Sequence, residues 1–264
     1  MDTAESRPSQ PPAPAAYALR ASRLTKRFGD QTAVDAIDLE VPRGSFYGFV
    51  GPNGAGKTTT LSMVTGLLRP DAGTAEVVGV DVWERPLEAK RSMGVMADGV
   101  MLFGKLTGEQ LVTYSGLLRG MDRKTVAERT ADLLRVLRLE EAAGRTVADY
   151  SAGMTKKIAM ASALVHAPEL LVLDEPFEAV DPVSARTIRG LLDSYVASGG
   201  TVILSSHVMD LVQRMCSHVG IIAEGRLMDS GTLEEVRGEQ DLESRFVELV
   251  GVEGGGEELS WLRV

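Results

Sequence analysis

Apolar and polar residues alternate along short stretches of the 264-residue chain, and the period of this alternation predicts strands. In residues 33–41 the apolar side chains from Ile37 onward are separated by acidic ones, which is typical of a strand with one buried face. Residues 218–231 predict a pair of strands joined by a glycine turn. Nearly unbroken apolar runs, as expected of strands buried in a parallel sheet, occupy residues 45–50, 169–175 and 200–206.

Other segments carry their apolar residues at helical spacing. A helix over residues 58–68 is expected after a glycine-rich loop, ending before Pro70. Thr125 and Glu128 form the pattern of a capping box. Further helices are expected at residues 107–119, 125–139 and 183–198. The order of these elements predicts an α/β fold, with a mostly parallel sheet drawn from both ends of the chain and a helical insertion of about residues 101–164.

Composition divides the chain into one domain with two tails. Residues 1–19 are rich in Pro, Ala and Ser and are expected to be disordered, and residues 241–264 are expected to form a loose extension of a domain spanning 20–240. No run approaches the roughly 18 apolar residues of a membrane span, and the start of the chain lacks the pattern of a signal peptide. The net charge of −9 argues against broad nucleic-acid binding, and the single cysteine excludes an intrachain disulfide or a cysteine metal cluster.

A glycine-rich loop follows the apolar run 45–50 and fits the phosphate-loop pattern G-x-x-x-x-G-K-[ST]. Glycines allow backbone N–H groups to turn toward phosphate oxygens at the start of the next helix. Lys57 supplies charge to the β- and γ-phosphates, and the Thr58 hydroxyl can ligate Mg²⁺. We therefore expect a nucleoside triphosphate site formed by Gly51, Pro52, Asn53, Gly54, Ala55, Gly56, Lys57, Thr58 and Thr59.

Two adjacent carboxylates, Asp174 and Glu175, end the apolar run 169–175. At the carboxyl end of a buried parallel strand, such residues emerge at the edge of the sheet where ligands bind. Asp174 is a candidate Mg²⁺ ligand, usually through water. Glu175 is a candidate for polarising an attacking water molecule.

With these residues the sequence resembles the ATP-binding subunits of ABC (ATP-binding cassette) transporters over about residues 24–236. The segment 150–154, YSAGM, is similar to the family's signature motif LSGGQ; it matches at Ser151 and Gly153 and departs from it at the other three positions. Asp181 resembles the family's D-loop aspartate, and His207 resembles its switch histidine. Phe28 resembles the aromatic residue that stacks on adenine, and Val34 the apolar residue beside the sugar.

The resemblance implies a P-loop NTPase fold of the ABC type, with a RecA-like, mostly parallel core sheet, an antiparallel β subdomain and the helical insertion. It implies an ATPase in which this chain pairs with a second copy or with a paralogue. The two subunits would enclose two ATP molecules, each phosphate loop facing the partner's Ser151–Gly153 helix start. A serine that caps a helix also favours anion binding, so both interpretations of Ser151 are compatible.

The resemblance also implies roles for individual residues. Lys57 would bind the phosphates, and Thr58 and Asp174 would hold Mg²⁺. Glu175 would be the general base, and His207 would sense the γ-phosphate.

Transport would require a separate membrane subunit that holds this chain at the inner face of the cell membrane, in the cytoplasm. The family's docking surface corresponds to about residues 98–120. There, Val100, Met101, Leu102 and Phe103 either receive a helix of that subunit or pack the insertion on the core. The end of the chain soon after the core favours export over import. The alternative is a soluble, non-transport ABC ATPase of the cluster-assembly type.

Asp98 stands where the resemblance places a glutamine that touches Mg²⁺ and the attacking water. Glutamine offers a neutral acceptor and a donor, whereas an ionised aspartate is shorter and only accepts hydrogen bonds. Three interpretations are open: Asp98 ligates Mg²⁺ directly or through water, it forms only an Asp-Gly turn, or the register slips at this point. We adopt the first as a hypothesis.

Overall fold

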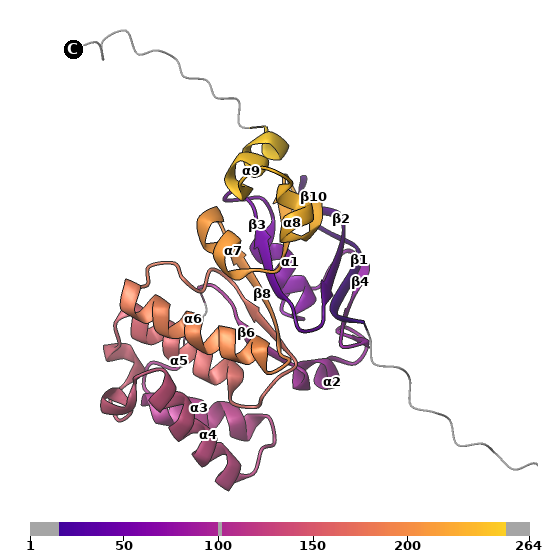
Figure 1. Cartoon of the computed structure of the whole chain (residues 1–264). Helices are drawn as coiled ribbons and strands as arrows, with labels where there is room; N and C mark the ends of the chain where they lie inside the picture. The colour runs from indigo at the N-terminus through magenta and orange to yellow at the C-terminus, as the bar shows by residue number, and fades with distance from the viewer. Residues whose placement is uncertain (1–15, 100–101, 252–264) are drawn as a thin grey trace, which may run out of the picture.

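The computed structural model describes residues 16–99 and 102–251, which are arranged around a six-stranded sheet (Figure 1). The strand order is β10-β9-β3-β8-β7-β6, and every neighbouring pair is parallel except β9 with β10. The carboxyl ends of the parallel strands therefore share one edge. The strands are β3 (Phe46–Val50), β6 (Met93–Met96), β7 (Leu170–Leu173), β8 (Thr201–Ser206), β9 (His218–Ala223) and β10 (Arg226–Thr232).

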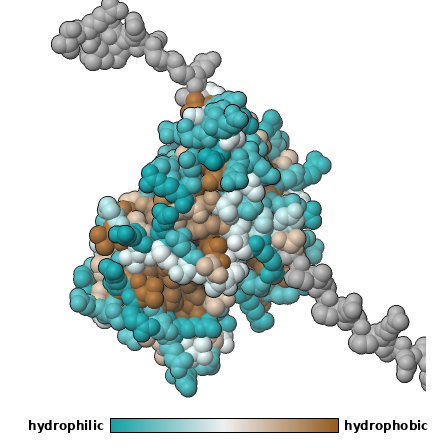
Figure 2. Space-filling view, viewed as in Figure 1, coloured by the Kyte–Doolittle hydropathy of each residue, from teal (hydrophilic) through white to brown (hydrophobic). Residues whose placement is uncertain are grey.

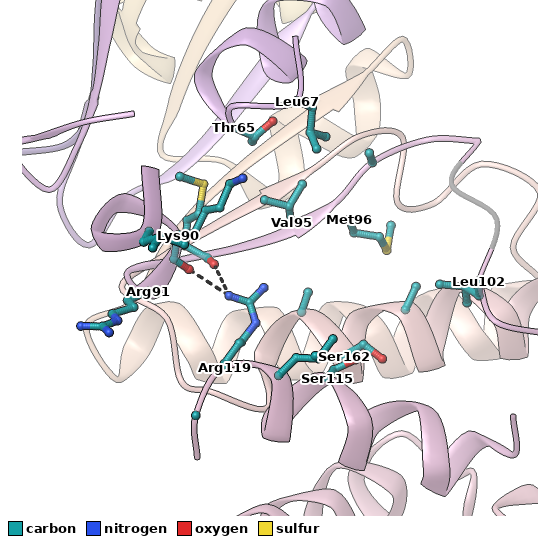
Figure 3. A pocket seen from close by; sticks show the side chains of 17 residues that line it. Thr65, Leu67, Lys90, Arg91, Val95, Met96, Leu102, Ser115, Arg119 and Ser162 are labelled. Atoms are coloured by element: carbon teal, nitrogen blue, oxygen red, sulfur yellow. Dashed lines mark hydrogen bonds between the residues drawn. The ribbon is translucent and has the colours of Figure 1, made fainter. Parts of the chain in front are cut away.

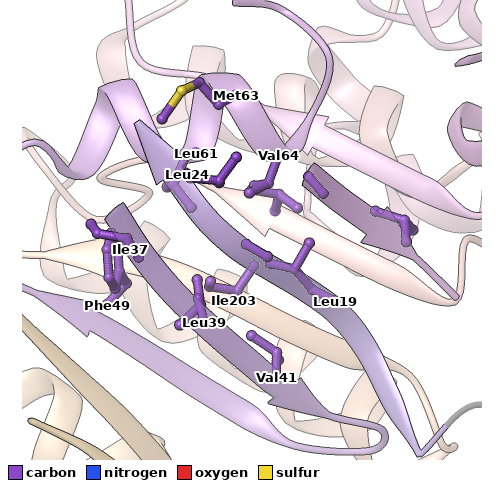
Figure 4. Close-up of a cluster of buried hydrophobic side chains, with 14 of the residues drawn as sticks. Leu19, Leu24, Ile37, Leu39, Val41, Phe49, Leu61, Met63, Val64 and Ile203 are labelled. Carbon is purple, nitrogen blue, oxygen red and sulfur yellow. The ribbon is translucent and has the colours of Figure 1, made fainter. Parts of the chain in front are cut away.

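An antiparallel sheet with the order β2-β1-β4-β5 packs against one face of the central sheet. Burial alternates along the second half of β2 and is irregular along β1, and the buried aliphatic side chains of both strands meet α1 and strands β3 and β8 in one apolar cluster (Figure 4). The elements are β1 (Tyr17–Phe28), β2 (Gln31–Pro42), β4 (Ala72–Val77), β5 (Val80–Asp81) and α1 (Lys57–Val64). This arrangement confirms the mostly parallel core with an antiparallel subdomain.

Helices cover the other face of the central sheet. Buried side chains of α5, α6, α7, α8 and α9 pack there against the apolar strands β3, β7 and β8. Figure 1 shows α8 and α9 at one end of the molecule. Besides α1, the helices outside the insertion in the described residues are α2 (Pro86–Arg91), α6 (Pro182–Ala197), α7 (Met209–Met215), α8 (Leu233–Arg237) and α9 (Leu242–Val250).

The helical insertion has its own apolar cluster and lies at the end opposite α9 (Figure 1). It comprises α3 (Gly108–Leu118), α4 (Arg123–Val136), α5 (Ala152–Leu164) and the short 3₁₀ turns η1 (Glu140–Ala142) and η2 (Val147–Asp149). Figure 2 shows a largely hydrophilic surface with a hydrophobic area among the helices on this side. A cavity of about 550 Å³ there is lined by residues that include Leu133, Leu191 and Tyr195.

Polar contacts near the start of β6 help to join the insertion to the core. At the end of α3, Arg119 Nη1 donates to the carbonyl oxygens of Lys90 at 2.9 Å and Met93 at 3.3 Å. His166 Nε2 lies 3.0 Å from the same Met93 oxygen. The first residue of β6 therefore receives donors from two segments of the insertion.

The predicted boundaries need correction at both ends of the domain. The tail predicted for residues 1–19 is too long, because Tyr17 and Leu19 already pair with β2. The extension predicted to be loose from residue 241 begins instead with α9, whose start Asp241 caps by accepting from the Ser244 amide at 2.8 Å. Residues 1–15 and 252–264 lie outside the described part of the chain.

The capping box at Thr125 is also wrong. Helix α4 begins two residues earlier, at Arg123, and the Asp122 carboxylate caps it by accepting from the Thr125 amide at 2.9 Å. Thr125 is therefore the third residue of the helix, and its amide, rather than its hydroxyl, takes part in the cap.

Candidate nucleotide site

The phosphate loop connects β3 to α1 at the carboxyl edge of the central sheet. Gly56, the N-cap of α1, has a φ of +105°, and a Cβ there would lie 2.6 Å from the Ala33 carbonyl oxygen. A Cβ on Gly51 would lie 2.3 Å from the Ile222 carbonyl oxygen. Both positions therefore require glycine. The backbone at Gly56 is left-handed, and at both positions a carbonyl oxygen of another strand lies too close to leave room for a Cβ.

Lys57 is held inside this loop. Its Nζ donates to the carbonyl oxygens of Gly51 at 2.7 Å and Pro52 at 3.2 Å, and it lies 3.8 Å from Glu175 Oε1. Burial lowers the pKa of Lys57, and the neighbouring carboxylates, Glu175 first, oppose that shift. The site therefore contains a poorly hydrated ammonium group, suited to an anion that can replace the carbonyl oxygens.

The two carboxylates that follow β7 have different surroundings. Asp174 is buried, with 3% of its surface exposed, and its Oδ1 accepts a hydrogen bond from Ser205 Oγ. Glu175 has a φ of +45°, and its Oε1 lies 3.2 Å from His207 Nδ1. A residue with a side chain rarely adopts this φ, and such conformations cluster at functional sites.

One cavity of about 290 Å³ collects most of the predicted phosphate-binding residues. It is open to solvent beside the start of α1, and Lys57, Glu175 and His207 all reach it. Its lining comprises Ala33, Pro52, Asn53, Gly54, Ala55, Gly56, Lys57, Thr58, Thr59, Asp98, Glu175, Glu178 and His207. Gly51 and Asp174 are outside this lining but contact residues of the site. The Gly51 carbonyl oxygen accepts from Lys57 Nζ, and Asp174 Oδ1 accepts from Ser205 Oγ, which in turn accepts from the Glu175 amide.

The structure does not bring the two residues predicted to meet the base and sugar into this lining. Phe28 is 51% exposed, at the end of β1, with Lys26 Nζ 5.7 Å from its ring centre. The ring is accessible and not buried in the core, and stacking on a base requires an accessible ring. Val34 is fully buried beneath Gly56, and its neighbour Ala33 faces the cavity instead. The alternation of side chains along β2 accounts for this correction.

The signature segment and the D-loop contact each other away from the cavity. Ser151 caps α5, its Oγ accepting from the Met154 amide at 3.3 Å, and it is exposed. Asp181 caps α6 by accepting from the amides of Val183 and Ser184 at 3.0 and 2.9 Å. A Cβ on Gly153 would lie 2.8 Å from Asp181 Oδ2, so this glycine allows the two helix starts to pack closely.

Asp98 lies at the cavity and forms a turn with Gly99, whose φ is +67°. Its Oδ1 is 3.5 Å from Lys156 Nζ on α5, and the same ammonium donates to the Glu175 carbonyl oxygen at 3.0 Å. Lys156 is not among the residues predicted from the sequence. The signal that could have found it is a pair of lysines within the otherwise apolar helix AGMTKKIAMASAL.

Comparison with known proteins places this geometry in a family. Residues 34–178 match the family described as ABC transporter. The chain belongs to the ABC transporter family. A solved structure described as the ATP-binding subunit of an ABC transporter has a TM-score of 0.82 and 27% sequence identity, covering 88% of this chain and 99% of that one. The chain is therefore an ATP-binding subunit of this family, as the signature segment suggested.

Curated relatives of this ABC subunit include two bacterial proteins. The probable multidrug ABC transporter ATP-binding protein YbhF of Escherichia coli is 33% identical over 245 residues, which are 90% of this chain and 42% of YbhF. The Nod factor export ATP-binding protein I of Cupriavidus metallidurans is 36% identical over 218 residues, which are 83% of this chain and 72% of that protein. The chain thus spans less than half the length of YbhF.

The donor atoms at the cavity of this ABC subunit suit Mg²⁺. Thr58 lines the cavity, and the Asp174 carboxylate is connected through Ser205 Oγ to the amide of the lining residue Glu175. Hydroxyl and carboxylate oxygens are the hard atoms that Mg²⁺ prefers. Among the described residues no group of three or more His, Cys, Asp or Glu side chains could hold a metal. One hydroxyl and one carboxylate fit an ion that is held largely by the phosphates of its substrate.

A second, larger hollow of this ABC subunit lies between the core and the insertion. It has a volume of about 720 Å³, and Figure 3 shows Arg119 reaching across it toward the main chain near Lys90. Its lining mixes apolar residues of β6, α3 and α5 with the basic residues Lys90, Arg91 and Arg119.

The residues predicted for docking are distributed differently around this groove. Leu102 lines it and packs on the insertion, whereas Phe103 is exposed and meets Tyr114 edge-to-face with ring centres 5.8 Å apart. Val100 and Met101 lie outside the described residues. Within residues 16–99 and 102–251, every helix is too short or too polar to cross a membrane.

Proposed function

We propose that this chain hydrolyses ATP as one of two ATP-binding subunits of an ABC exporter, whose transport path is supplied by a separate membrane protein. The observation that carries the proposal is the single cavity into which the phosphate-loop backbone, Lys57 and the carboxylate of Glu175 all open. A cation beside helix-start amides favours the phosphates of ATP, and a carboxylate 3.8 Å from that cation is within reach of the reacting end.

In this proposal Glu175 accepts a proton from a water molecule. The water oxygen attacks the γ-phosphorus, and the bond from that phosphorus to the β–γ bridging oxygen breaks, which leaves ADP and inorganic phosphate. Lys57 offsets charge on the phosphate oxygens, and His207, 3.2 Å from Glu175 Oε1, orients the carboxylate and contacts the γ-phosphate. Mg²⁺, when bound, offsets further negative charge, and Thr58 and Asp174 would hold it.

The proposed dimer is supported by residues that the cavity lacks. Ser151, Gly153 and Asp181 are absent from the lining of their own chain's cavity, yet Ser151 caps an exposed start of a thirteen-residue helix. Placed against a second subunit, that helix start would face the γ-phosphate on the partner's phosphate loop. The partner is a second copy or a paralogue, and ATP would link the two because its phosphate meets donors from both.

Export is supported by the relatives, one of which is described as a Nod factor export protein and another as a probable multidrug transporter component. The groove between core and insertion is the docking surface for the membrane subunit, because it exposes Leu87 and Leu118 beside a basic rim. This contact would hold the chain at the inner face of the cell membrane. ATPase activity that the cognate membrane protein neither binds nor stimulates would instead favour a soluble, non-transport ABC ATPase.

Replacing the proposed base tests the assignment directly. Glu175→Gln removes the proton acceptor but keeps the shape of the side chain, so we expect steady-state ATP hydrolysis to fall by roughly 100-fold or more while ATP affinity stays within a few-fold of wild type. Phosphate release and binding of a fluorescent ATP analogue would be measured on the same preparation. Glu128→Gln is the matched control, because Glu128 is exposed on α4 and does not line the cavity. Wild-type turnover in Glu175→Gln would contradict the proposal.

A further inference from the structure

Lys156 of α5 contacts both the main chain of the proposed base and the carboxylate of Asp98. Its Nζ donates to the Glu175 carbonyl oxygen at 3.0 Å and lies 3.5 Å from Asp98 Oδ1. The Lys156 side chain is 21% exposed and that of Asp98 47%, so the pair lies at the margin of the nucleotide cavity. We propose that Lys156 is a positioning residue that fixes the backbone of Glu175, and that Asp98 holds Lys156 in place for this contact.

The backbone of Glu175 needs such support. Its φ of +45° is unfavourable for a residue with a side chain and persists only where the surroundings determine it. The Glu175 amide donates to Ser205 Oγ at 2.9 Å, and its carbonyl oxygen accepts from Lys156. With both peptide groups held, the direction of the Cα–Cβ bond is set, and the carboxylate is aimed into the cavity.

The contact joins three segments that are distant in sequence. Asp98 follows β6, Glu175 follows β7, and Lys156 lies five residues after Ser151 on α5. A movement of α5 relative to the sheet would therefore move the ammonium away from the Glu175 carbonyl oxygen. The inference rests on the proposed function. It implies that the rate of hydrolysis depends on the position of α5 when the partner subunit's nucleotide contacts the start of that helix.

Lys156 is separate from the nucleotide-binding machinery. It does not line the phosphate cavity, whereas Lys57 does. Its loss should therefore affect the rate of the chemical step and leave the affinity for ATP largely unchanged. A lysine with a merely structural role would instead change the melting temperature, or both kinetic parameters together.

The first experiment compares Lys156→Met with Lys156→Arg. A charged hydrogen bond is worth roughly 10- to 100-fold in an equilibrium, so we expect kcat of Lys156→Met to fall by about 10- to 50-fold, with KM for ATP within about 2-fold. Lys156→Arg keeps the charge and donors and should stay within about 5-fold of wild type. Lys124→Met is the matched control, because Lys124 forms an exposed pair with Glu128 on α4, 3.9 Å apart, away from the cavity.

The second experiment tests whether the three residues act as a unit. Asp98→Asn should lower kcat by about 2- to 5-fold, and the double variant Asp98→Asn/Lys156→Met should be no slower than Lys156→Met alone. In a Glu175→Gln background, Lys156→Met should cause no further loss, because the group that it positions is gone. The Mg²⁺ concentration for half-maximal activity separates this role of Asp98 from the hypothesis that Asp98 ligates Mg²⁺. It should be the same in Asp98→Asn and wild type, whereas the loss of a metal ligand would raise it.

Several outcomes would overturn the inference: wild-type kcat in Lys156→Met, multiplicative losses for Asp98 and Lys156, a raised Mg²⁺ requirement in Asp98→Asn, or a change confined to KM. Melting temperature and ATP-analogue binding establish that each variant is folded. If Lys156→Met does not fold, Lys156→Gln should lower kcat in the same direction. Active Glu175→Gln would refute the proposed function itself, whereas inactive Glu175→Gln with fully active Lys156→Met would refute only the positioning role.

Discussion

The core and the helical insertion each present a helix start suited to an anion, and the two are built differently. The start of α1 opens into a cavity that also holds Lys57, Glu175 and His207. The start of α5 has only the cap formed by Ser151, on an exposed surface. Helix dipole and free amides are common to both, so the difference lies in the surrounding charges. The core alone carries a nearly complete phosphate site, whereas in the proposed function the insertion carries a helix start that would complete the site of a second subunit.

The largest effect should come from the core. Lys57→Ala removes the buried ammonium that the loop carbonyl oxygens hold in place, so ATP affinity should fall by roughly 100-fold, as expected for one or two charge-assisted contacts. Titration with a fluorescent ATP analogue measures this, with Lys124→Ala as the exposed-lysine control. Unchanged affinity would show that the helix start suffices without its cation, and the contrast with α5 would be lost.

Substitutions of Ser151 in the insertion should have a smaller effect, which is limited to the rate of ATP turnover. Asp and Asn both cap helices as well as Ser does, so Ser151→Asp and Ser151→Asn should preserve α5. The carboxylate of Ser151→Asp would repel the partner's phosphate and should lower ATPase activity by about 30- to 100-fold, whereas Ser151→Asn should cost less than about 10-fold. ATP binding by the isolated subunit should stay within about 2-fold for both.

Mixing two inactive variants tests whether the start of α5 completes the phosphate site of a second subunit. A dimer of Lys57→Ala with Ser151→Asp would contain one composite site with an intact phosphate loop and an intact signature start. Combined preparations should therefore regain activity that neither has alone. No recovery at protein concentrations that form dimers would argue that the Ser151 helix does not complete a partner's site.

Local patterns predicted much of the core. The phosphate loop, the buried runs of β3, β7 and β8 and the pair β9–β10 each carry their signal within a few consecutive residues, and the structure has them within one or two residues of the expected ends. The loop's two constrained glycines and its lysine likewise follow from one short motif.

What the sequence could not provide depends on contacts between distant segments. Strand β1 has four register irregularities against β2, so its apolar residues keep no strict period. Helix α9 did carry a signal, with apolar residues at 242, 246, 249 and 250, but the glycine-rich stretch beyond it obscured the pattern. The partners of Lys156 lie 58 and 19 residues away, at Asp98 and Glu175, and no local pattern announces them.

The smallest of the expected effects tests the seam between core and insertion. Burial, and next the charge of Arg119, lower the pKa of His166 from 6.5 to about 4. Its Nε2 faces the Met93 carbonyl oxygen, and among the described residues its buried Nδ1 has no hydrogen-bond partner. The ring is therefore neutral in the folded protein at pH 5, where an unfolded chain would have bound a proton.

Because the pKa of His166 is lowered on folding, its contribution to stability is fully present above pH 6.5 and is lost as the pH falls toward 4. From pH 7 to pH 5 the free energy of unfolding should drop by about 1–2 kcal/mol through this residue, allowing for partial access to water. Urea titrations of wild type and His166→Gln at both pH values measure that difference, which the variant should lack. Arg119→Met, which removes the second cause of the shift, should reduce the pH effect without abolishing it. If His166→Gln kept the full pH dependence, burial of the His166 ring would not be the source of that dependence.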